Sequence, residues 1–465
     1  MLLAWLAVLA ITALVGVAYA PGVMRPDSFA QYEEALSGRY TDWHPPVLAW
    51  LWGVIDPWRL GPLPLFALHL VLFAAGTGLL AEGLLRGGRP LAAALVLAAA
   101  LLPIPLGYVG VLMKDTTLAL ALLLAFGLVG RFMLAGQRVP WPAALAAAAL
   151  AMFAALLRFN APFAVVPAAL CLWPWLRGRS WRVQGMVGGA ALVAGVALAP
   201  LASQALFRPE RTQVSLSPII YDLGGITAKS GRNQFPELGV PDFVAVNAQQ
   251  CYTPFWWDNY AFGECHFVFE RMRALAQEGR IGGVRLWLNA LAAEPVAYLQ
   301  HRVSHLNMNL RFLLPVAMED VTFIANRPTD RGFQFTPNAL TLAIRNAGLL
   351  QASTPLGWPA FWVAAAAGWL LLAPGLAPGP ARLMLVALTL SALGYASSYI
   401  VFSVASDLRY HLWTMMATAL ASAIGVGALW RARVWPWRRA LLAFVPAFLV
   451  AALGTAWRVW NLPAL

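Results

Sequence analysis

Long apolar runs constrain this sequence more than any other feature. A helix needs roughly 20 apolar residues to cross the hydrocarbon core of a bilayer, and the chain offers many such runs. It is 60% hydrophobic and only 11% charged, whereas soluble domains are about 25% charged. The runs do not alternate as the strands of a membrane β-barrel do. We therefore predict an all-α polytopic membrane protein with about eleven spans, at residues 2–20, 63–85, 91–112, 116–135, 141–157, 161–176, 184–206, 357–374, 383–403, 408–429 and 441–458.

The basic residues indicate how these spans are oriented. Alternate short loops hold twelve arginines and one acid, Glu82. The arginines are Arg86, Arg89, Arg131, Arg138, Arg177, Arg179, Arg182, Arg382, Arg431, Arg433, Arg438 and Arg439. The positive-inside rule assigns such loops to the cytoplasm. We expect a multi-pass protein of a bacterial cytoplasmic (inner) membrane whose other face meets the periplasm or exterior. The formal charge of +12 is then an orientation signal, and no nucleic-acid motif accompanies it.

The spans divide the chain into three sections. Residues 1–206 hold seven spans and a first outer loop, residues 21–62. Residues 207–356 form a polar outer insertion, which we expect to be folded because structureless loops of that length are uncommon. Residues 357–465 hold the last four spans. The first span ends in "AYAPG", where Pro21 favours a retained anchor over a cleaved signal.

Two features stand out in the outer insertion. Cys251 and Cys265 both fall there, and an oxidising periplasm favours a disulfide between them. The alternative is two unpaired thiols. Residues 281–310 read as one or two amphipathic helices lying at the membrane interface, with a restart or kink at Pro295.

The first outer loop carries local start and stop signals. Ser28 followed by Gln31 fits a capping box, and Gly38 fits the end of a helix. The adjacent prolines at 45–46 suit the first turn of a second helix. Two short surface helices are therefore expected, with Asp42 and His44 just before the second one.

Strong polar groups also cluster at the predicted outer ends of spans. They are Lys114 and Asp115, Arg158 and Asn160, and Asp407, Arg409 and Tyr410. Singly, each group has a plainer explanation as a helix-end ion pair, a headgroup anchor or a helix cap. Together on one face they favour a functional reading, because ionisable groups at membrane depth are costly. Lys114 and Lys229 are the chain's two lysines beside thirty arginines, and a compact ammonium suits a point contact to phosphate.

Other motifs of catalysis are missing from the sequence. His301 and His305 share a helix face with metal-binding spacing, but no nearby acid completes a set, and a pair of interfacial histidines is the favoured interpretation. We assign no metal site. The sequence has no Walker loop and no nucleophile elbow, which argues against a nucleotide-driven pump.

Residues 26–51, "PDSFAQYEEALSGRYTDWHPPVLAWL", resemble the first outer loop of GT-C membrane glycosyltransferases, especially protein O-mannosyltransferases and related lipid-linked-sugar transferases. The matching residues are Asp27, Gly38, Tyr40 and the Asp-Trp-His-Pro-Pro run at 42–46. Ser28 departs from the family, which tends to have a second acid there. The resemblance implies a GT-C-like fold that transfers a sugar, with inversion, from a polyprenyl-phosphate donor at the outer face.

This resemblance implies a role for each polar group. Asp27 is expected to be the base that takes the acceptor's proton, while Asp42 and His44 position substrate or hold Asp27. The donor phosphate is assigned to the cations Lys114, Arg158 and Arg409. Substrate positioning is assigned to Gln31, Asp115, Asn160 and Tyr410.

The acceptor and the cofactors stay open at this point. The acceptor is a protein, lipid A or an envelope glycan. No cofactor is certain, and dependence on a divalent metal is undecided. The alternative functions are a transporter or flippase for a lipid-linked or anionic solute, and a non-catalytic partner of envelope machinery.

Overall fold

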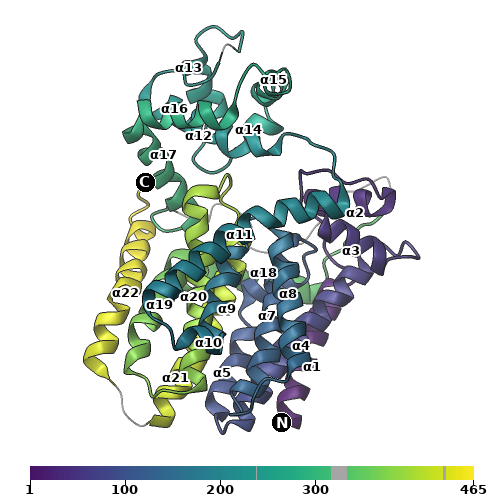
Figure 1. The fold of residues 1–465 in the computed structure, drawn as a ribbon, viewed down its shortest axis with the longest axis vertical. Coiled ribbons are helices and arrows are strands. Elements are labelled where there is room, and N and C mark those ends of the chain that lie inside the picture. The colour runs from purple at the N-terminus through teal and green to yellow at the C-terminus, as the bar shows by residue number, and fades with distance from the viewer. Residues whose placement is uncertain (237, 316–331, 433–435) are drawn as a thin grey trace. The chain divides into compact units, whose positions relative to one another are not determined.

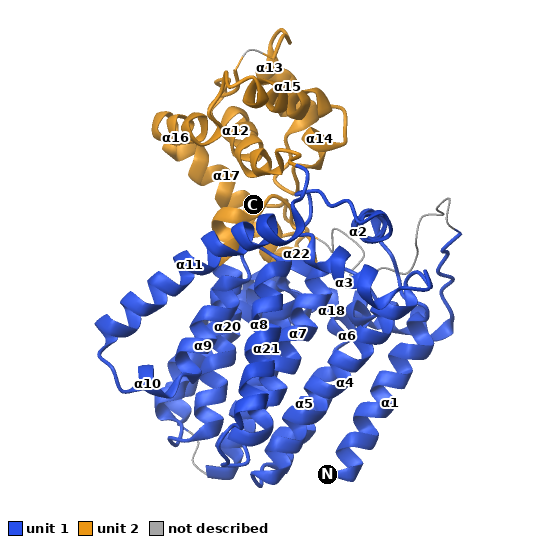
Figure 2. Ribbon diagram, turned by 45° about the vertical axis from the view of Figure 1, so that its right-hand side comes forward, with its two compact units in different colours: residues 1–210, 316–397, 409–456 blue, residues 211–315, 398–408, 457–465 orange. Residues whose placement is uncertain are grey.

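The computed structural model describes residues 1–236, 238–315, 332–432 and 436–465. Within these ranges every regular element is a helix and the β-bridges are isolated ones, so the all-α fold class is confirmed. The chain separates into two compact units (Figure 2). Unit 1 comprises residues 1–210, 316–397 and 409–456, and unit 2 comprises residues 211–315, 398–408 and 457–465.

The apolar runs form helices of unequal length (Figure 1). The seven that are long and apolar enough to cross a membrane are α1 (Leu2–Tyr19), α4 (Leu63–Arg86), α7 (Lys114–Met133), α11 (Trp181–Phe207), α20 (Pro380–Phe402), the segment Leu408–Ala432 with η5 (Leu408–His411) and α21 (Leu412–Ala432), and α22 (Trp437–Val459). The pair α5 (Pro90–Ala100) and α6 (Pro103–Val109), bent by 65°, makes an eighth if it is one span. Shorter apolar helices are α8 (Trp141–Leu157), α9 (Pro162–Leu172) and the segment Pro359–Gly375 with α19 (Pro359–Leu372) and η4 (Ala373–Gly375).

These eleven apolar segments match the predicted positions, but their lengths do not support eleven spans. Only seven or eight are long enough by length and composition, so the predicted count is not confirmed. Proline and polar residues explain the short helices. Pro103 follows the break between α5 and α6, and α8 ends at Leu157 just before Arg158, with Pro162 opening α9. Proline disfavours helical backbone in the residue before it.

Close backbone packing holds α7 against α4 in unit 1 (Figure 1). A Cβ on Gly127 of α7 would come 2.5 Å from the carbonyl oxygen of Gly76 in α4, so both positions need glycine. Small residues allow membrane helices to approach this closely. The N-terminus of α7, which carries Lys114 and Asp115, is thereby fixed against its neighbours.

The first outer loop forms two short helices, although their starts differ from the predicted ones. The first, α2 (Pro26–Ser37), begins two residues early, so Ser28 is its third residue and not its N-cap. The Ser28 hydroxyl accepts a bond from the Arg25 N–H at 3.0 Å and donates to Leu112 O at 2.5 Å. This tertiary partner replaces the predicted capping box with Gln31. Gly38 ends α2 with φ of 66°, as predicted.

The second helix of this loop, α3 (Val47–Ile55), packs against α2. Pro46 is its N-cap, so the two prolines precede the helix and do not form its first turn. The rings of Tyr32 and Trp52 lie 5.0 Å apart, and the Tyr32 hydroxyl donates to Asp56 at 2.8 Å. These contacts hold α2 against α3.

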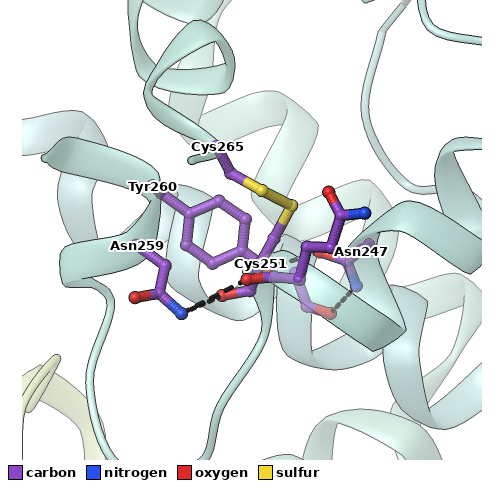
Figure 3. The surroundings of a disulfide bond; sticks show 7 residues. Asn247, Cys251, Asn259, Tyr260 and Cys265 are labelled. Carbon is purple, nitrogen blue, oxygen red and sulfur yellow. Dashed lines mark hydrogen bonds between the residues drawn. A yellow bond between two sulfur atoms is a disulfide. The ribbon is translucent and has the colours of Figure 1, made fainter. Parts of the chain in front are cut away.

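Unit 2 contains two consecutive helices separated at a proline, and a disulfide. Two helices, α16 (Gly283–Ala293) and α17 (Pro295–Leu310), meet at the predicted break before Pro295. Cys251 and Cys265 are joined in a disulfide, and Asn259 donates to the Cys251 carbonyl at 3.2 Å (Figure 3). The remaining helices of this unit are η1 (Val214–Leu216), α12 (Ser217–Ser230), α13 (Phe243–Val246), η2 (Asn247–Cys251), α14 (Asp258–Ala261) and α15 (His266–Gln277).

The end of the predicted insertion belongs to unit 1. There α18 (Ala339–Ala352) donates from the Thr341 hydroxyl to the carbonyl of Ala18 in α1, and Gln351 accepts from the N–H of Ile104 in α6. Also in unit 1 are α10 (Pro174–Arg177) and η3 (Pro355–Gly357).

His301 and His305 are buried in the core of unit 2 instead of lying at an interface. His301 lies 3.1 Å from Asp222 through Nε2 and 2.9 Å from the Tyr252 hydroxyl through Nδ1. His305 Nδ1 lies 2.8 Å from the Pro254 carbonyl. Both ring nitrogens of His301 therefore have protein partners, and the pair helps to form the core of the unit.

Candidate active site

Polar groups from four distant parts of unit 1 meet in one network of charges. Asp27, at the start of α2, receives Arg409 Nη1 on Oδ2 at 3.0 Å. On its other oxygen, Asp27 faces His44 Nε2 at 4.0 Å. His44 Nδ1 in turn lies 2.7 Å from the ammonium of Lys114, the first residue of α7.

Asp115 joins this network to the turn between α8 and α9. Its carboxylate pairs with Arg158 Nη1, and its second oxygen lies 3.9 Å from Arg409 Nε. Arg158 also donates to Asn160 at 3.2 Å and stacks over the Tyr410 ring at 4.4 Å. Three groups of this chain thus hold Arg158 in place.

Accessibility divides the network into an inner and an outer layer. The side chains of Asp115 and Arg158 retain 1% and 9% exposure, whereas Asp27 retains 28% and Arg409 retains 13%. An incoming ligand therefore reaches the Asp27–Arg409 pair first. The buried Asp115–Arg158 pair lies behind it and is shielded from water.

Burial and neighbouring charges set the protonation states of His44 and Asp27, which lie outside the spans. Burial lowers the pKa of His44 to about 3, so its ring is neutral at pH 7. Because an ammonium only donates, the Lys114 contact leaves the ring proton on Nε2, facing Asp27. Burial by itself would raise the pKa of Asp27, but the positive charges of Arg409 and Lys114 hold it well below its usual range.

With His44 neutral, the network contains three cations and two carboxylates. The cations are Lys114, Arg158 and Arg409, and the carboxylates are Asp27 and Asp115. The sum, three minus two, is one positive charge. Such a site attracts an anion.

Two further predicted site residues, Asp42 and Gln31, have different surroundings. Asp42 is half-buried and held through its backbone, whose N–H donates to the Glu210 carbonyl at 2.9 Å. The Gln31 side chain is fully buried, and its amide nitrogen and oxygen find no hydrogen-bond partner among the described residues. Asp407 belongs to unit 2.

Glu34 also helps to form the site, although it was not predicted from the sequence. Its Oε1 accepts from the backbone N–H of Thr41 at 3.0 Å and from the Thr41 hydroxyl at 2.6 Å. This clamp attaches residues 40–46, and His44 with them, to α2. The spacing of seven residues from Asp27 was the available signal, because residues two turns apart share a helix face.

Comparisons with known proteins return distant structural likeness only. No family model matches the sequence, and no curated protein matches it. One similar solved structure is the oligosaccharyltransferase AglB from Archaeoglobus fulgidus in complex with an inhibitory peptide and a dolichol-phosphate, at 15% identity and a TM-score of 0.36, covering 99% of this chain and 56% of that one. A second structure of the Archaeoglobus fulgidus oligosaccharyltransferase, tethered with an acceptor peptide, is similar at 13% identity and a TM-score of 0.36. That match covers 99% of this chain and 55% of the other.

A further match is ArnT from Cupriavidus metallidurans bound to undecaprenyl phosphate, at 14% identity and a TM-score of 0.32, covering 92% of this chain and 78% of that one. All of these are glycosyltransferases of the GT-C class, which residues 26–51 resemble. The chain spans about half the length of the two oligosaccharyltransferase chains. At these TM-scores the likeness carries no inference about activity.

Proposed function

We propose that this protein is an inverting glycosyltransferase of the GT-C type. It moves a sugar from a polyprenyl-phosphate donor to an acceptor at the outer face of the cytoplasmic membrane. The observation that carries the proposal is the Asp27–Arg409 pair, 3.0 Å apart and partly exposed, with Lys114 held close by through His44. It combines a carboxylate for an acceptor proton with cations for a phosphate. Both groups are needed for displacement at a sugar carbon that bears a phosphate.

The reaction follows from these positions as a single displacement. The acceptor's hydroxyl or amine attacks the anomeric carbon, and the bond between that carbon and the phosphate oxygen breaks. Asp27 takes the acceptor proton, while polyprenyl phosphate leaves with an additional negative charge. Arg409 and Lys114 stabilise that charge where it develops. A single displacement inverts the configuration at the carbon and needs no covalent intermediate.

The inner groups have supporting tasks in this scheme. Arg158 is engaged by Asp115, Asn160 and Tyr410, so we assign it to holding Asp115, and through that carboxylate to orienting Arg409. His44 is a neutral bridge that positions Asp27 relative to Lys114. The phosphate contacts proper then fall to Lys114 and Arg409.

Donor binding also prepares the base. In the free site Asp27 is paired with Arg409, and the low pKa that results makes it a weak proton acceptor. A donor phosphate competes for the same guanidinium. As Arg409 turns to the phosphate, the pKa of Asp27 rises toward its ordinary value and the carboxylate becomes a better base. We therefore expect the donor to bind before the acceptor reacts.

The test is turnover of undecaprenyl-phosphate sugars by the purified full chain, read as release of undecaprenyl phosphate. We expect Asp27→Asn to lower the rate by about 100-fold or more, which is typical for loss of a general base. Glu33→Gln, an exposed acid on the same helix, is the matched control and should keep full activity. Normal turnover by Asp27→Asn would remove Asp27 from the role of base.

Metal dependence is measured in the same assay by adding a chelator. The described residues hold no group of three or more His, Cys, Asp or Glu side chains that could bind a metal ion. Candidate acceptors are a secreted protein, lipid A or an envelope glycan. They are compared by the sugar that each one gains.

A further inference from the structure

The turn between α9 and α11 presents aromatic and cationic side chains together at the surface of unit 1. Trp173 and Trp175 are each 49% exposed and Trp181 is 77% exposed. The cations of this turn are Arg177, Arg179 and Arg182, and all three are exposed. Residues 173–182, called the tryptophan–arginine turn below, therefore offer three large rings and three positive charges to the surroundings.

Among the residues that the structure describes, no acid pairs with the arginines of this turn. The sequence contains no Asp or Glu from 159 to 209. Elsewhere in unit 1, Arg86 and Arg131 both pair with Glu82, so the turn differs from another arginine-rich part of the same unit.

Hydrogen bonds hold the turn in one conformation. The Gln184 amide nitrogen, in the first turn of α11, donates to the carbonyl of Arg179 at 3.0 Å and to the carbonyl of Leu176 at 3.3 Å. The Arg179 N–H also donates to the Leu176 carbonyl, and the Leu176 side chain is buried. The arginine side chains therefore leave from a backbone that is already ordered.

The aromatic rings orient two of the guanidinium groups. Arg179 lies over the Trp175 ring at 4.6 Å, and Arg182 lies over the Trp181 ring at 5.6 Å. A guanidinium stacked on a ring keeps its N–H edge free to bind an oxyanion with two parallel bonds. Tryptophan favours the headgroup level of a bilayer. The combination matches the boundary between lipid chains and phosphate groups.

Because α9 is short, the arginines of the tryptophan–arginine turn lie close to the hydrocarbon core, where a charge needs an anion beside it. Its eleven residues rise about 16 Å, roughly half of the ~30 Å hydrocarbon thickness. One end of α9 adjoins Asn160 of the candidate site, and the other end leads to the tryptophan–arginine turn. Arginines near hydrocarbon are costly unless lipid phosphates or water reach them. Phosphates drawn toward the turn remove that cost.

We propose that the tryptophan–arginine turn is a docking site for the phosphate groups of anionic membrane lipids, in the leaflet at the end of α9 remote from Asp27. The tryptophan rings lie at the level of the lipid glycerol groups and the adjoining acyl-chain carbons. The guanidinium groups bind the headgroup phosphates of the same leaflet. This inference is independent of the proposed transfer reaction.

Lipid retention by the solubilised full chain tests the proposal. The protein is titrated with phosphatidylglycerol or phosphatidylcholine, and bound lipids are counted by native mass spectrometry. The unaltered protein should bind phosphatidylglycerol more tightly. Each arginine near an anionic surface contributes about fivefold in affinity, so replacing Arg177, Arg179 and Arg182 with Gln should weaken phosphatidylglycerol binding on the order of 100-fold.

A matched triple variant separates this site from general positive charge. Arg382→Gln, Arg438→Gln and Arg439→Gln together remove the same charge from outside the turn, and this control should bind phosphatidylglycerol normally. Equal retention of the two lipids by the unaltered protein would overturn the proposal. So would an equal loss in both triple variants, or displacement of the lipid by inorganic phosphate. If the Gln variant does not fold, the corresponding Lys triple variant must still prefer phosphatidylglycerol over phosphatidylcholine.

Discussion

Arg158 and Arg409 contact the same carboxylate, Asp115, but they stand in different surroundings. Arg158 is nearly buried and held by Asn160 and Tyr410 as well. Arg409 reaches past Asp115 to the partly exposed Asp27. A buried charge that loses its partner carries its full desolvation cost, whereas a charge at an accessible edge keeps some water. Replacing Arg158 and replacing Arg409 should therefore have different effects on stability and on activity.

We predict that Arg158→Gln mainly lowers stability and that Arg409→Gln mainly lowers activity. Removing one partner of a buried ion pair costs about 3–5 kcal/mol, so Arg158→Gln should lower the thermal unfolding midpoint by several degrees. Arg409→Gln should unfold close to the unaltered protein but show a raised donor KM and a lowered kcat. Thermal unfolding and donor kinetics are measured on both variants. The double variant Arg158→Gln with Asp115→Asn should regain part of the lost stability, and a result without recovery would contradict the pairing.

The identities of the site residues were easier to predict than their partners. Lys114 and Arg409 stood out because ionisable residues at span ends are rare and costly, whereas Asp27 was identified by its matching position in the GT-C-like first outer loop. The contact between His44 and Lys114 was not foreseeable, because it depends on how residues 40–46 dock beside the start of α7. Glu34, which fixes that docking through Thr41, has the pattern of an ordinary surface acid in the sequence.

Helix α7 is the element on which the site depends most directly. Its first two residues supply Lys114 and Asp115, and its middle is pressed against α4 at Gly127. A displaced α7 would shift an ammonium and a carboxylate together. Displacements of about 1 Å can cost on the order of 100-fold in rate.

We predict that Gly127→Val disturbs both packing and activity. The new side chain would meet the backbone oxygen of Gly76, which cannot rotate away. Overpacking of this kind typically costs about 1–3 kcal/mol. Gly189→Ala in α11 is the control, because nothing lies within 4 Å of its added Cβ. Unfolding midpoints and donor turnover are compared, and an unchanged Gly127→Val protein would argue against close contact of α4 with α7.

Helix α17 should make unit 2 sensitive to acid. Burial lowers the pKa of His305 to about 3 and also lowers the pKa of His301. In the unfolded chain both histidines titrate near 6.5, so protons bind the unfolded state first. The stability that neutral His305 provides is complete above about pH 6.5 and is lost as the pH falls toward 3.

Hydrogen exchange measures this effect in the full chain. Exchange of the α17 amides should accelerate as the pH is lowered from about 6.5 to about 4.5, after correction for intrinsic rates. His305→Gln should flatten this pH dependence. The exposed His266, on α15, provides the control His266→Gln, which should leave it unchanged. A flat profile in the unaltered protein would show that neither buried histidine limits the stability of α17.

Element positions were largely predictable, whereas element starts were not. The Ser28–Gln31 spacing and the glycine at 38 located α2, but its first residues depended on the hydrogen bond from Ser28 to Leu112, 84 positions away. The break before Pro295 was local, and it was predicted. The lengths of α8 and α9 were set by the polar turn at Arg158–Asn160, which enters the site and shortens both helices.

At the scale of the whole molecule, charge and cysteine chemistry support the same orientation. The arginine-rich loops should face the cytoplasm, and a disulfide such as Cys251–Cys265 persists in an oxidising compartment. The candidate site uses Arg158 and Asn160, which lie at the ends of α8 and α9 opposite the arginine-rich loops. The orientation predicted from the arginines would therefore put Arg158 and Asn160 at the outer face.

We predict that single cysteines on the two faces react differently with a membrane-impermeant maleimide. The free thiol Cys171 is first replaced by Ser to give a background without other free thiols. Gln277→Cys, at the exposed end of α15, should then be labelled on intact spheroplasts. Gln137→Cys, exposed in the turn after α7, should be labelled only after permeabilisation. Both substitutions replace an exposed glutamine, so differences in access and not in chemistry decide the result. Labelling of Gln137→Cys before Gln277→Cys would invert the orientation and place Asp27 on the cytoplasmic face, where the proposed outer-face transfer could not occur.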